Sequence, residues 1–389
     1  METFEPGSYI RREVSEAIEE AGRFFSVITV TGPRQSGKST LLRHLFPDIP
    51  YCSLEDPDTR LFASSDPKGF LSGLSDKAII DEVQRVPDLL SYIQSIVDLH
   101  PERKFYLTGS SNFALIRQIT QSLTGRTALF ELLPLSLREI KGRVGNMGIN
   151  DLLYKGFYPA LWCDKNIPRL FYPNYTRTYL DRDVRDLLAI RDLDAFHKFL
   201  SLCAGRIGSV FNSSELSNEI GVSVNTINAW LSVLQASYIV YLLPPFFTNT
   251  RKRLTKSPKI YFYDTGLASW LLEIESPSVM ERDKMRGHLF ENMIIMEYMK
   301  GRFNMGRTPY IYFYRDSNGN EVDLLEKSGS TYNCMEIKSA MTFNPDFIKG
   351  LSAFYRAFPD LTGRKKVIYA GESMGDFHGV DISNFRDIL

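Results

Sequence analysis

The sequence has few cysteines and no excess of charge of either sign. None of its four cysteines shows CxxC spacing, which argues against a zinc knuckle or a disulfide framework and favours buried thiols in a reducing compartment. Lysine and arginine number 46, against 46 acidic residues. Because the chain has no global basic field, nucleic acid or an anionic membrane would have to be met by a local patch. The cysteines are Cys52, Cys163, Cys203 and Cys334.

The chain also lacks a long hydrophobic run. The longest run, residues 238–247, has roughly half of the ~20 residues that a membrane-spanning helix needs, and it contains two prolines. Residues 1–7 are acidic where a signal peptide would be basic and then apolar. We therefore expect a cytoplasmic protein with no membrane partner.

The sequence is long enough for several folded domains. Its 389 residues, 43% hydrophobic and 24% charged, predict two or three globular domains. A helical pattern over residues 9–25 precedes a β-branched run at 26–31. Strand-like runs recur at 77–81 and 104–108, and 127–132 is a candidate fourth strand. Helix-compatible sequence between such runs is typical of a parallel α/β sheet.

The remainder of the chain contains three segments that differ in their expected secondary structure. Residues 136–206 are mostly helix-compatible and predict a helical lid or bridge. Residues 213–241 contain a short helix, a turn at Gly221, a second helix and a strand-like run, which predict a helix-turn-helix with a wing. The final third predicts a second α/β core, with a helix at 287–299 and strands at 310–314, 321–325 and 332–338.

A phosphate-binding motif follows the first predicted strand. Residues 32–39 read Gly-Pro-Arg-Gln-Ser-Gly-Lys-Ser and match GxxxxGK[ST] between a strand and a helix. The glycines let backbone amides curl round phosphates, Lys38 supplies a positive charge, and the Ser39 hydroxyl can ligate Mg²⁺. The sequence therefore predicts an ATP and Mg²⁺ site. The loop residues expected to contact them are Gly32, Pro33, Arg34, Gln35, Ser36, Gly37, Lys38, Ser39 and Thr40.

Polar residues end the next two core strands. Asp81 and Glu82 end the second, where Asp81 can hold the magnesium shell and Glu82 can polarise the attacking water. Ser110 and Asn112 follow the third, where a hydroxyl or an amide could orient that water. A plain polar turn is the alternative for Ser110 and Asn112.

These three segments together resemble AAA-type ATPases of the additional-strand class, as the nucleotide-binding loop, the acidic strand and the first sensor. The resemblance implies a positive residue that reaches the γ-phosphate from the lid or from a neighbouring subunit. Arg126 and Arg117 are the nearest candidates. A surface arginine or one paired with a carboxylate is the alternative for each.

A second constellation lies near the carboxyl end. Asp323 is followed after twelve residues by Glu336 and Lys338. On a strand, Glu336 and Lys338 share one face about 7 Å apart, and Asp323 on a neighbouring strand can meet them. The carboxylates could bind a Mg²⁺ ion that activates water against a phosphodiester, with Lys338 stabilising the developing charge and Glu291 completing the metal site. Cross-strand charge pairing is the alternative.

The order of a helical glutamate, an aspartate and Glu-x-Lys resembles the PD-(D/E)xK nuclease-like superfamily. With the ATPase, it resembles a prokaryotic family of AAA-type ATP-binding proteins whose C-terminal domain has no assigned function. One departure is Val322, which stands where the superfamily name has proline. The resemblance covers nearly the whole chain through the motifs above and through residues 179–184, 256–266 and 290–292.

The charge of the predicted helix-turn-helix bears on partners. Residues 213–250 contain no lysine or arginine, and phosphate contacts supply most of the affinity in DNA binding. We therefore favour a structural or protein-docking winged helix over a DNA reader. The basic run Arg251, Lys252 and Arg253, with Lys256 and Lys259, could touch a DNA backbone or be a solvated loop.

The expected fold class is α/β. It comprises an AAA-type P-loop ATPase core with a parallel sheet (1–135), a helical lid (136–206), a winged helix (207–255) and a restriction-endonuclease-like PD-(D/E)xK domain (256–389). The expected function is Mg²⁺-dependent ATP hydrolysis coupled to the last two modules, with DNA, a protein or a second copy of the chain as candidate partners. One alternative is a nucleotide-dependent signalling or scaffold switch that cleaves nothing. A kinase is the other, which the Asp81-Glu82 pair disfavours.

Overall fold

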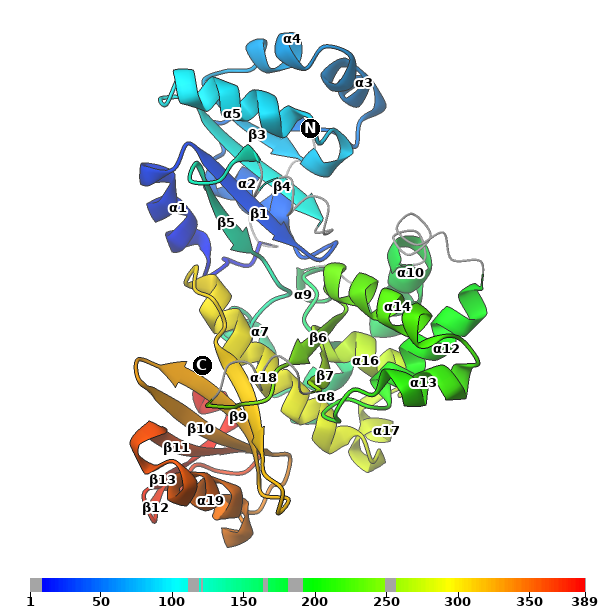
Figure 1. Cartoon of the computed structure of the whole chain (residues 1–389), viewed down its shortest axis with the longest axis vertical. Helices are drawn as coiled ribbons and strands as arrows, with labels where there is room; N and C mark the ends of the chain where they lie inside the picture. Colours follow the sequence, from blue (N-terminus) through cyan, green and yellow to red (C-terminus); the bar gives the residue numbers. More distant parts are fainter. Residues whose placement is uncertain are drawn as a thin grey trace.

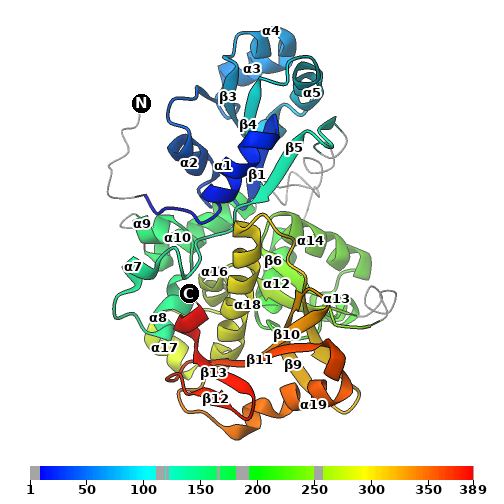
Figure 2. The same cartoon turned by 90° about the vertical axis from the view of Figure 1, so that its left-hand side faces the viewer.

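The computed structural model describes residues 9–110, 119, 122–163, 167–180, 192–248 and 257–388, with residues 179 and 180 described by their backbone only. These residues form an amino-terminal lobe with a five-stranded sheet, a helical middle lobe and a carboxyl-terminal lobe with a six-stranded sheet (Figure 1). The long helix α18 (Arg286–Asn304) runs from beneath the first lobe past the last one (Figure 2). The predicted α/β class, with a parallel-sheet ATPase-like lobe and a separate C-terminal sheet, is confirmed.

The amino-terminal sheet is parallel and has the order β2-β3-β4-β1-β5. Strand β4 lies between β1 and β3, as the additional-strand arrangement requires. The four strands expected from the sequence are present. Strand β2 was not predicted, because three residues are too few for a periodic pattern. The bounds are β1 (Val27–Gly32), β2 (Tyr51–Ser53), β3 (Lys77–Asp81), β4 (Lys104–Ser110) and β5 (Thr127–Glu131).

Helices cover both faces of this sheet. Two pack on the face that carries Ile28 and Val30, and three pack on the face that carries Val27 and Leu107. All six residues of β1 are therefore buried, which is why that strand reads as a continuous β-branched run. The first pair is α1 (Ser15–Phe24) and α2 (Lys38–Leu45), and the others are α3 (Pro57–Ser65), α4 (Pro67–Ser72) and α5 (Leu89–Leu99).

The middle lobe is mostly helical. Its first helices are α7 (Lys141–Val144), α8 (Ile149–Lys155), α9 (Ala160–Cys163), α10 (Pro168–Tyr175) and α12 (Leu193–Ala204). Helices α13 (Ser213–Ile220) and α14 (Val224–Ala236) lie where the sequence predicts two helices. Gly221, in the left-handed region with φ 84°, ends α13, and the Ser223 hydroxyl caps α14.

The middle lobe extends beyond the predicted boundary at residue 256. Strand β6 (Val240–Leu243) pairs antiparallel with β7 (Lys259–Phe262), so a strand assigned to the last domain completes a hairpin of the middle lobe. Helix α16 (Thr265–Leu271) packs against α8 and α10, and α17 (Pro277–Arg282) packs against α8. The expected boundary after residue 255 separates β6 from β7, because the sequence of β7 does not show that its partner strand is β6.

The carboxyl-terminal sheet is mixed and has the order β12-β13-β11-β10-β9-β8. Helix α19 (Lys349–Ala357) covers one face through Leu351 and Phe354, and α18 packs on the other, against β10. The predicted second α/β core is therefore present. Its strands are β8 (Ile311–Arg315), β9 (Glu321–Ser328), β10 (Thr331–Lys338), β11 (Thr362–Tyr369), β12 (Gly375–Phe377) and β13 (Val380–Asn384).

Buried contacts join the lobes. Helix α18 is buried on most of its sides because it packs against α8, α16, β5 and β10. The Tyr238 hydroxyl, just before β6, donates to Glu131 Oε2 on β5 at 2.7 Å. The four cysteines are free, and two of them are buried. Among the described helices, none is both long enough and apolar enough to cross a membrane.

Candidate functional site

The phosphate loop leaves the carboxyl end of β1 and enters α2. Gly32 (φ 145°), Gln35 (φ 60°) and Gly37 (φ 92°) all have positive φ, which curls the loop as successive inward-pointing amides require. Gly32 also approaches the chain after β5 closely, since a Cβ there would lie 2.2 Å from the Leu132 carbonyl oxygen. Only glycine fits this position.

Two groups of the loop are prepared for an anion. The buried Lys38 ammonium donates to the carbonyl oxygens of Gly32 at 3.1 Å and Pro33 at 2.8 Å, so it lies across the mouth of the loop. The Ser36 hydroxyl is buried and has no hydrogen-bond partner among the described residues. A polar atom left unpaired inside a curled loop fits phosphate binding.

Asp81 connects the loop to the end of β3. Its Oδ1 accepts a hydrogen bond from Ser39 Oγ at 2.6 Å, and its Oδ2 accepts one from the Tyr51 hydroxyl at 2.8 Å. Thr108 on β4 donates a further short hydrogen bond to Oδ1. Burial, together with Asp81, raises the pKa of Tyr51. All three partners are neutral donors, so none of these three hydrogen bonds pairs the carboxylate with a side-chain cation.

Glu82 follows Asp81 in the left-handed region, with φ 57°. Its amide donates to Thr108 Oγ1 at 3.3 Å, and its Oε2 accepts a short hydrogen bond from Gln84 Nε2. Gln84 also donates to Ser110 Oγ at 2.8 Å, so the acidic turn is tied to the end of β4. The structure thus brings the predicted Ser39, Asp81, Glu82 and Ser110 together at one edge of the sheet.

Two residues predicted to contact the nucleotide, Asn112 and Arg126, are not seen at this site. Asn112, like Arg117, lies outside the described residues. Arg126 does not join the loop: it pairs with Asp98, with Nη2 to Oδ2 at 2.9 Å, and it precedes Thr127, which is paired with the first residue of β1. That position is the amino edge of the sheet, about 17 Å along β1 from the loop. Arg126 therefore does not reach the loop of its own chain, and the expected contact with the γ-phosphate of a neighbouring subunit stays a prediction.

Sequence reasoning missed four side chains that support the site: Tyr51, Gln84, Thr108 and Arg12. Tyr51 lies on β2, which the sequence does not predict. Thr108 lies within β4, whereas the sequence pattern draws attention only to the polar residues that follow this strand. Arg12 precedes α1, and its buried guanidinium donates to the Ser36 carbonyl oxygen at 2.7 Å. No local pattern marks it, because its partners are 24 and more residues away.

The second predicted constellation is assembled in the carboxyl-terminal lobe. Lys338 Nζ lies 2.6 Å from Glu336 Oε1 and 3.2 Å from Asp323 Oδ2. The Ile337 amide donates to Asp323 Oδ2 at 2.8 Å, which fixes the aspartate against β10. Glu336 Oε2 is buried without a hydrogen-bond partner among the described residues.

The middle lobe contributes to this cluster. On β7, the Tyr261 hydroxyl donates to Glu291 Oε1 at 2.5 Å, and the buried Lys259 ammonium lies 3.5 Å from the same oxygen. Lys259 also makes a short ion pair with Glu321. We refer to Lys259, Glu291, Asp323, Glu336 and Lys338 as the carboxylate cluster.

Burial dominates the electrostatics of the carboxylate cluster. It raises the pKa of Glu336 to about 8, with Asp323 adding to the effect, and it raises the pKa of Glu291 to about 7. Among the described residues, no three acidic, histidine or cysteine side chains are arranged to hold a metal ion. The structure therefore does not bring the predicted metal set Glu291, Asp323 and Glu336 into metal-binding geometry, because the ammonium groups of Lys338 and Lys259 lie against these carboxylates.

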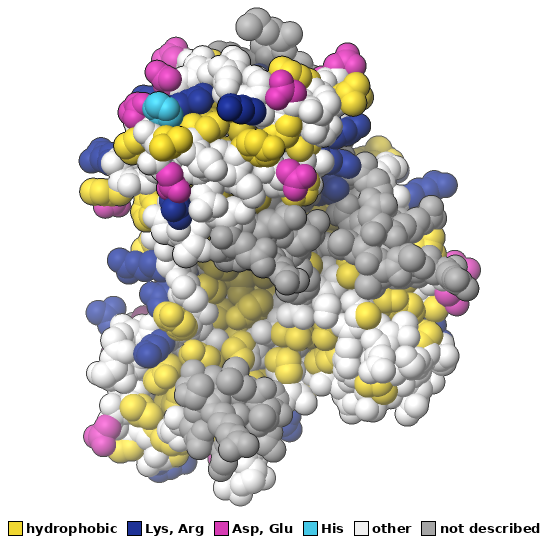
Figure 3. Space-filling view, turned by 45° about the horizontal axis from the view of Figure 1, so that its top comes forward, with side chains coloured by type: hydrophobic (Ala, Val, Ile, Leu, Met, Phe, Trp, Pro, Cys, Tyr) yellow, Lys and Arg dark blue, Asp and Glu magenta, His cyan; other side chains and the backbone are white. Residues whose placement is uncertain are grey.

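The helix-turn-helix surface carries little positive charge. Arg206 beneath it is paired with Glu215 and Glu219, and Lys198 donates to the Glu219 carbonyl oxygen. Residues 251–253 lie outside the described part of the chain. On the face in Figure 3, Lys and Arg side chains are interspersed with Asp and Glu over the amino-terminal lobe.

Comparison with known proteins defines the class to which this geometry belongs. A family model described as an AAA domain matches residues 25–141. Two models described as domains of unknown function match residues 146–278 (DUF8612) and 286–385 (DUF4143). The amino-terminal lobe is an AAA-type P-loop ATPase domain, and the matched ranges divide the chain near residue 280.

Relatives extend over most of the chain. The uncharacterised protein Rv2008c of Mycobacterium tuberculosis is 31% identical over 372 residues, which cover 93% of this chain and 80% of the relative. The uncharacterised protein MJ1544 of Methanocaldococcus jannaschii is 24% identical over 328 residues, covering 76% and 71%. A solved structure, the Walker-type ATPase of Pyrococcus abyssi, matches at 14% identity and a TM-score of 0.43, covering 69% of this chain and 99% of that one.

The chain belongs to the same family as the mycobacterial protein, a family of AAA-domain proteins. The predicted resemblance to AAA-type ATP-binding proteins with a C-terminal domain of no assigned function is thereby confirmed. The winged-helix and nuclease-like assignments stay predictions.

Proposed function

We propose that the chain binds ATP with Mg²⁺ at the loop of residues 32–40 and hydrolyses it with Glu82 as the general base. The observation that carries this proposal is the 2.6 Å contact between Ser39 Oγ and Asp81 Oδ1. It joins the two motifs from which a phosphate-bound magnesium ion takes its protein ligands. The neutral partners of Asp81 leave its charge available for that ion.

Each residue of the site has a separate role in ATP binding or hydrolysis. Lys38 moves from the Gly32 and Pro33 carbonyl oxygens to the phosphates, while the curled amides hold the phosphate oxygens. Glu82, held by Gln84, accepts a proton from the water whose oxygen forms the new bond to the γ-phosphorus as the bond to ADP breaks. Mg²⁺, when bound, neutralises charge on the β- and γ-phosphates.

The test is steady-state ATP turnover together with nucleotide binding in Glu82→Gln. We expect binding within about twofold of wild type and turnover lowered by about 10²-fold or more, since general-base catalysis contributes roughly 10²–10⁴-fold. Glu55→Gln is the matched control, because Glu55 is exposed on the loop after β2. Equal turnover in wild type and Glu82→Gln would remove Glu82 from the mechanism.

A second candidate function is Mg²⁺-dependent cleavage of a phosphodiester at Asp323, Glu336 and Lys338, with DNA as the candidate substrate. What favours it is that Asp323 and Glu336 lie on neighbouring strands with Lys338 between them, so that Mg²⁺ would bind there once the Lys338 ammonium group withdraws from the two carboxylates. In the test, DNA is incubated with ATP and Mg²⁺, and nicking is compared in wild type, Lys338→Ala and Asp323→Asn. Nicking lost in both variants supports cleavage. A wild-type chain that nicks no DNA favours the scaffold alternative, in which this lobe and the winged helix bind a protein partner.

A further inference from the structure

The buried Arg12 binds three parts of the amino-terminal lobe at once. Its Nη1 donates to the Ser36 carbonyl oxygen at 2.7 Å, its Nη2 donates to the Leu133 carbonyl oxygen at 2.7 Å, and its Nε donates to Glu139 Oε1 at 3.0 Å. A guanidinium presents its donors in a rigid planar fork. One rigid group thus contacts both the phosphate loop and Glu139.

Glu139 continues the connection toward the carboxyl-terminal lobe. Its Oε1 also accepts from the Glu13 amide at 2.8 Å, and its Oε2 accepts from the Ser136 amide at 2.8 Å. Glu13 Oε2 in turn accepts from Ser136 Oγ at 3.1 Å and from Asn304 Nδ2 at 2.9 Å. Asn304 is the last residue of α18, so the loop and the helix are connected through side chains together with the backbone amides that Glu139 accepts from.

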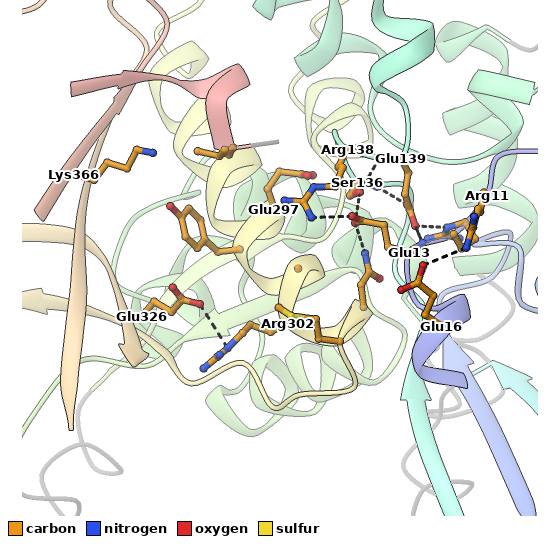
Figure 4. Close-up of a pocket in the computed structure, with 16 residues that line it drawn as sticks. Arg11, Glu13, Glu16, Ser136, Arg138, Glu139, Glu297, Arg302, Glu326 and Lys366 are labelled. Carbon is orange, nitrogen blue, oxygen red and sulfur yellow. Dashed lines mark hydrogen bonds and ion pairs between the residues drawn. The ribbon is translucent and has the colours of Figure 1, made fainter. Parts of the chain in front are cut away.

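A second set of contacts holds α18 to the same segment. The Leu137 amide donates to Glu297 Oε2 at 2.7 Å, and Lys300 Nζ donates to the Leu135 carbonyl oxygen at 2.8 Å. The Glu297 and Lys300 side chains also pair with each other at 2.7 Å. Figure 4 shows Glu13, Ser136, Glu139 and Glu297 turned toward one another along one wall of a cavity of about 750 Å³ between α1 and α18.

The far half of α18 reaches the carboxylate cluster. Glu291, more than three turns before Asn304, contacts Tyr261 and Lys259. At the first residue of the helix, Arg286 donates to the Ser339 carbonyl oxygen at 3.0 Å, directly after Lys338. One continuous helix thus touches the contact network of the phosphate loop at one end and the carboxylate cluster at the other.

We propose that Arg12 is a positioning residue that couples the phosphate loop to α18, so that nucleotide binding and the packing of α18 influence each other. This coupling rests on the proposed function. Bringing phosphates to the amides of residues 36–38 shifts the Ser36 carbonyl group, and Arg12 passes the shift through Glu139 and Glu13 to Asn304. Because coupling between two binding equilibria is reciprocal, a change at Asn304 alters nucleotide affinity without contact with the loop.

The test measures two quantities on the full chain with and without MgATP: the dissociation constant and KM for ATP, and amide hydrogen exchange of residues 297–304. In wild type we expect nucleotide to slow exchange there. Arg12→Gln should raise the dissociation constant and KM by about tenfold or more, with a smaller change in kcat, and should abolish the nucleotide-dependent change in exchange.

Three further variants separate positioning from a purely structural role. Arg12→Lys keeps a donor for Ser36 and should restore part of the ATP affinity. Asn304→Ala should weaken ATP binding by about threefold and reduce the exchange response, and it decides the case if Arg12→Gln does not fold. Arg11→Gln, at an exposed neighbour that pairs with Glu16, should match wild type.

Three outcomes would overturn the coupling: exchange in α18 that does not respond to nucleotide in wild type, a folded Arg12→Gln with unchanged affinity, or an Asn304→Ala variant identical to wild type in both measurements. Failure of the proposed function is distinguishable, because the wild-type chain would then bind no nucleotide at all.

Discussion

The carboxylates of the phosphate site and those of the carboxylate cluster have partners of opposite kinds, neutral hydroxyl groups in the first and lysine ammonium groups in the second. In the amino-terminal lobe, Asp81 is held by hydroxyl groups of Ser39, Tyr51 and Thr108, which orient it without cancelling its charge. In the carboxyl-terminal lobe, Lys338 and Lys259 lie against Asp323, Glu336 and Glu291. A carboxylate held by neutral donors is ready for an incoming cation. One that is already paired with a lysine admits a cation only if the ammonium group withdraws.

The largest expected effect is a loss of ATP binding at the phosphate site. Lys38→Ala should lower ATP affinity by about 10²-fold or more, because the β- and γ-phosphates lose a charge-assisted partner while the curled loop remains. Equilibrium binding of a fluorescent ATP analogue measures it. Lys68→Ala on α4, which is exposed, serves as the control. Equal affinities in Lys38→Ala and wild type would show that this loop is not the phosphate site.

The next effect concerns the buried lysine of the carboxylate cluster. Lys259→Met should lower the free energy of unfolding by about 3–5 kcal/mol, because removal of the buried ammonium group leaves Glu291 inside the cluster without its nearest cation. Lys349→Met removes an exposed pair with Asp346 and should cost about 0–1 kcal/mol. Urea denaturation of both variants measures the difference. Similar losses in the two would mean that Lys259 is not the counter-charge of this cluster.

Stability should also depend on pH through the same cluster. The folded chain raises the pKa of Glu336 from 4.5 to about 8 and that of Glu291 to about 7, so it retains protons that the unfolded chain has lost. This contribution to stability is complete below pH 4.5 and is lost as the pH rises through 7 and 8. The stability advantage of wild type over Glu336→Gln should therefore shrink between about pH 5 and pH 8. An advantage that grows over this range would contradict the raised pKa.

The smallest effect is expected at the helix-turn-helix. Asn225→Ala, on the exposed side of α14, should change any DNA affinity by less than about twofold, because no cation on this helix contacts phosphate. Charge reversal at Arg251, Lys252 and Arg253 should instead weaken binding and flatten its salt dependence. Fluorescence anisotropy at several salt concentrations separates the two. A large loss in Asn225→Ala with an unchanged salt slope would identify α14 as a DNA reader.

The phosphate site was largely predictable from sequence because its residues end parallel strands. Ser39 and Asp81 are 42 residues apart, yet the carboxyl ends of β1 and β3 lie at one edge, so the motifs had to meet there. The same logic does not bring Arg126 to the loop of its own chain, because Arg126 emerges at the amino end of β5. Tyr51 was missed because β2 is too short to leave a pattern.

The second constellation was predictable only in part. The two-residue period of β10 placed Glu336 and Lys338 on one face, and the structure brings Asp323 to them. Lys259 was read as part of a basic run, because nothing in the sequence shows that β7 pairs with β6 and carries its lysine into a cluster on another lobe. Arg12 was missed for a similar reason, since its partners are far away in the sequence.

The most direct test is the Mg²⁺ dependence of phosphate release from ATP by the full chain, compared between wild type and Asp81→Asn. If Asp81 and Ser39 hold the metal, wild-type turnover saturates with Mg²⁺. Asp81→Asn should then require about tenfold or more Mg²⁺ and turn over more slowly, since it loses the charge that attracts the ion. Wild-type turnover that is independent of Mg²⁺, or an identical Mg²⁺ dependence in Asp81→Asn, would contradict the central claim.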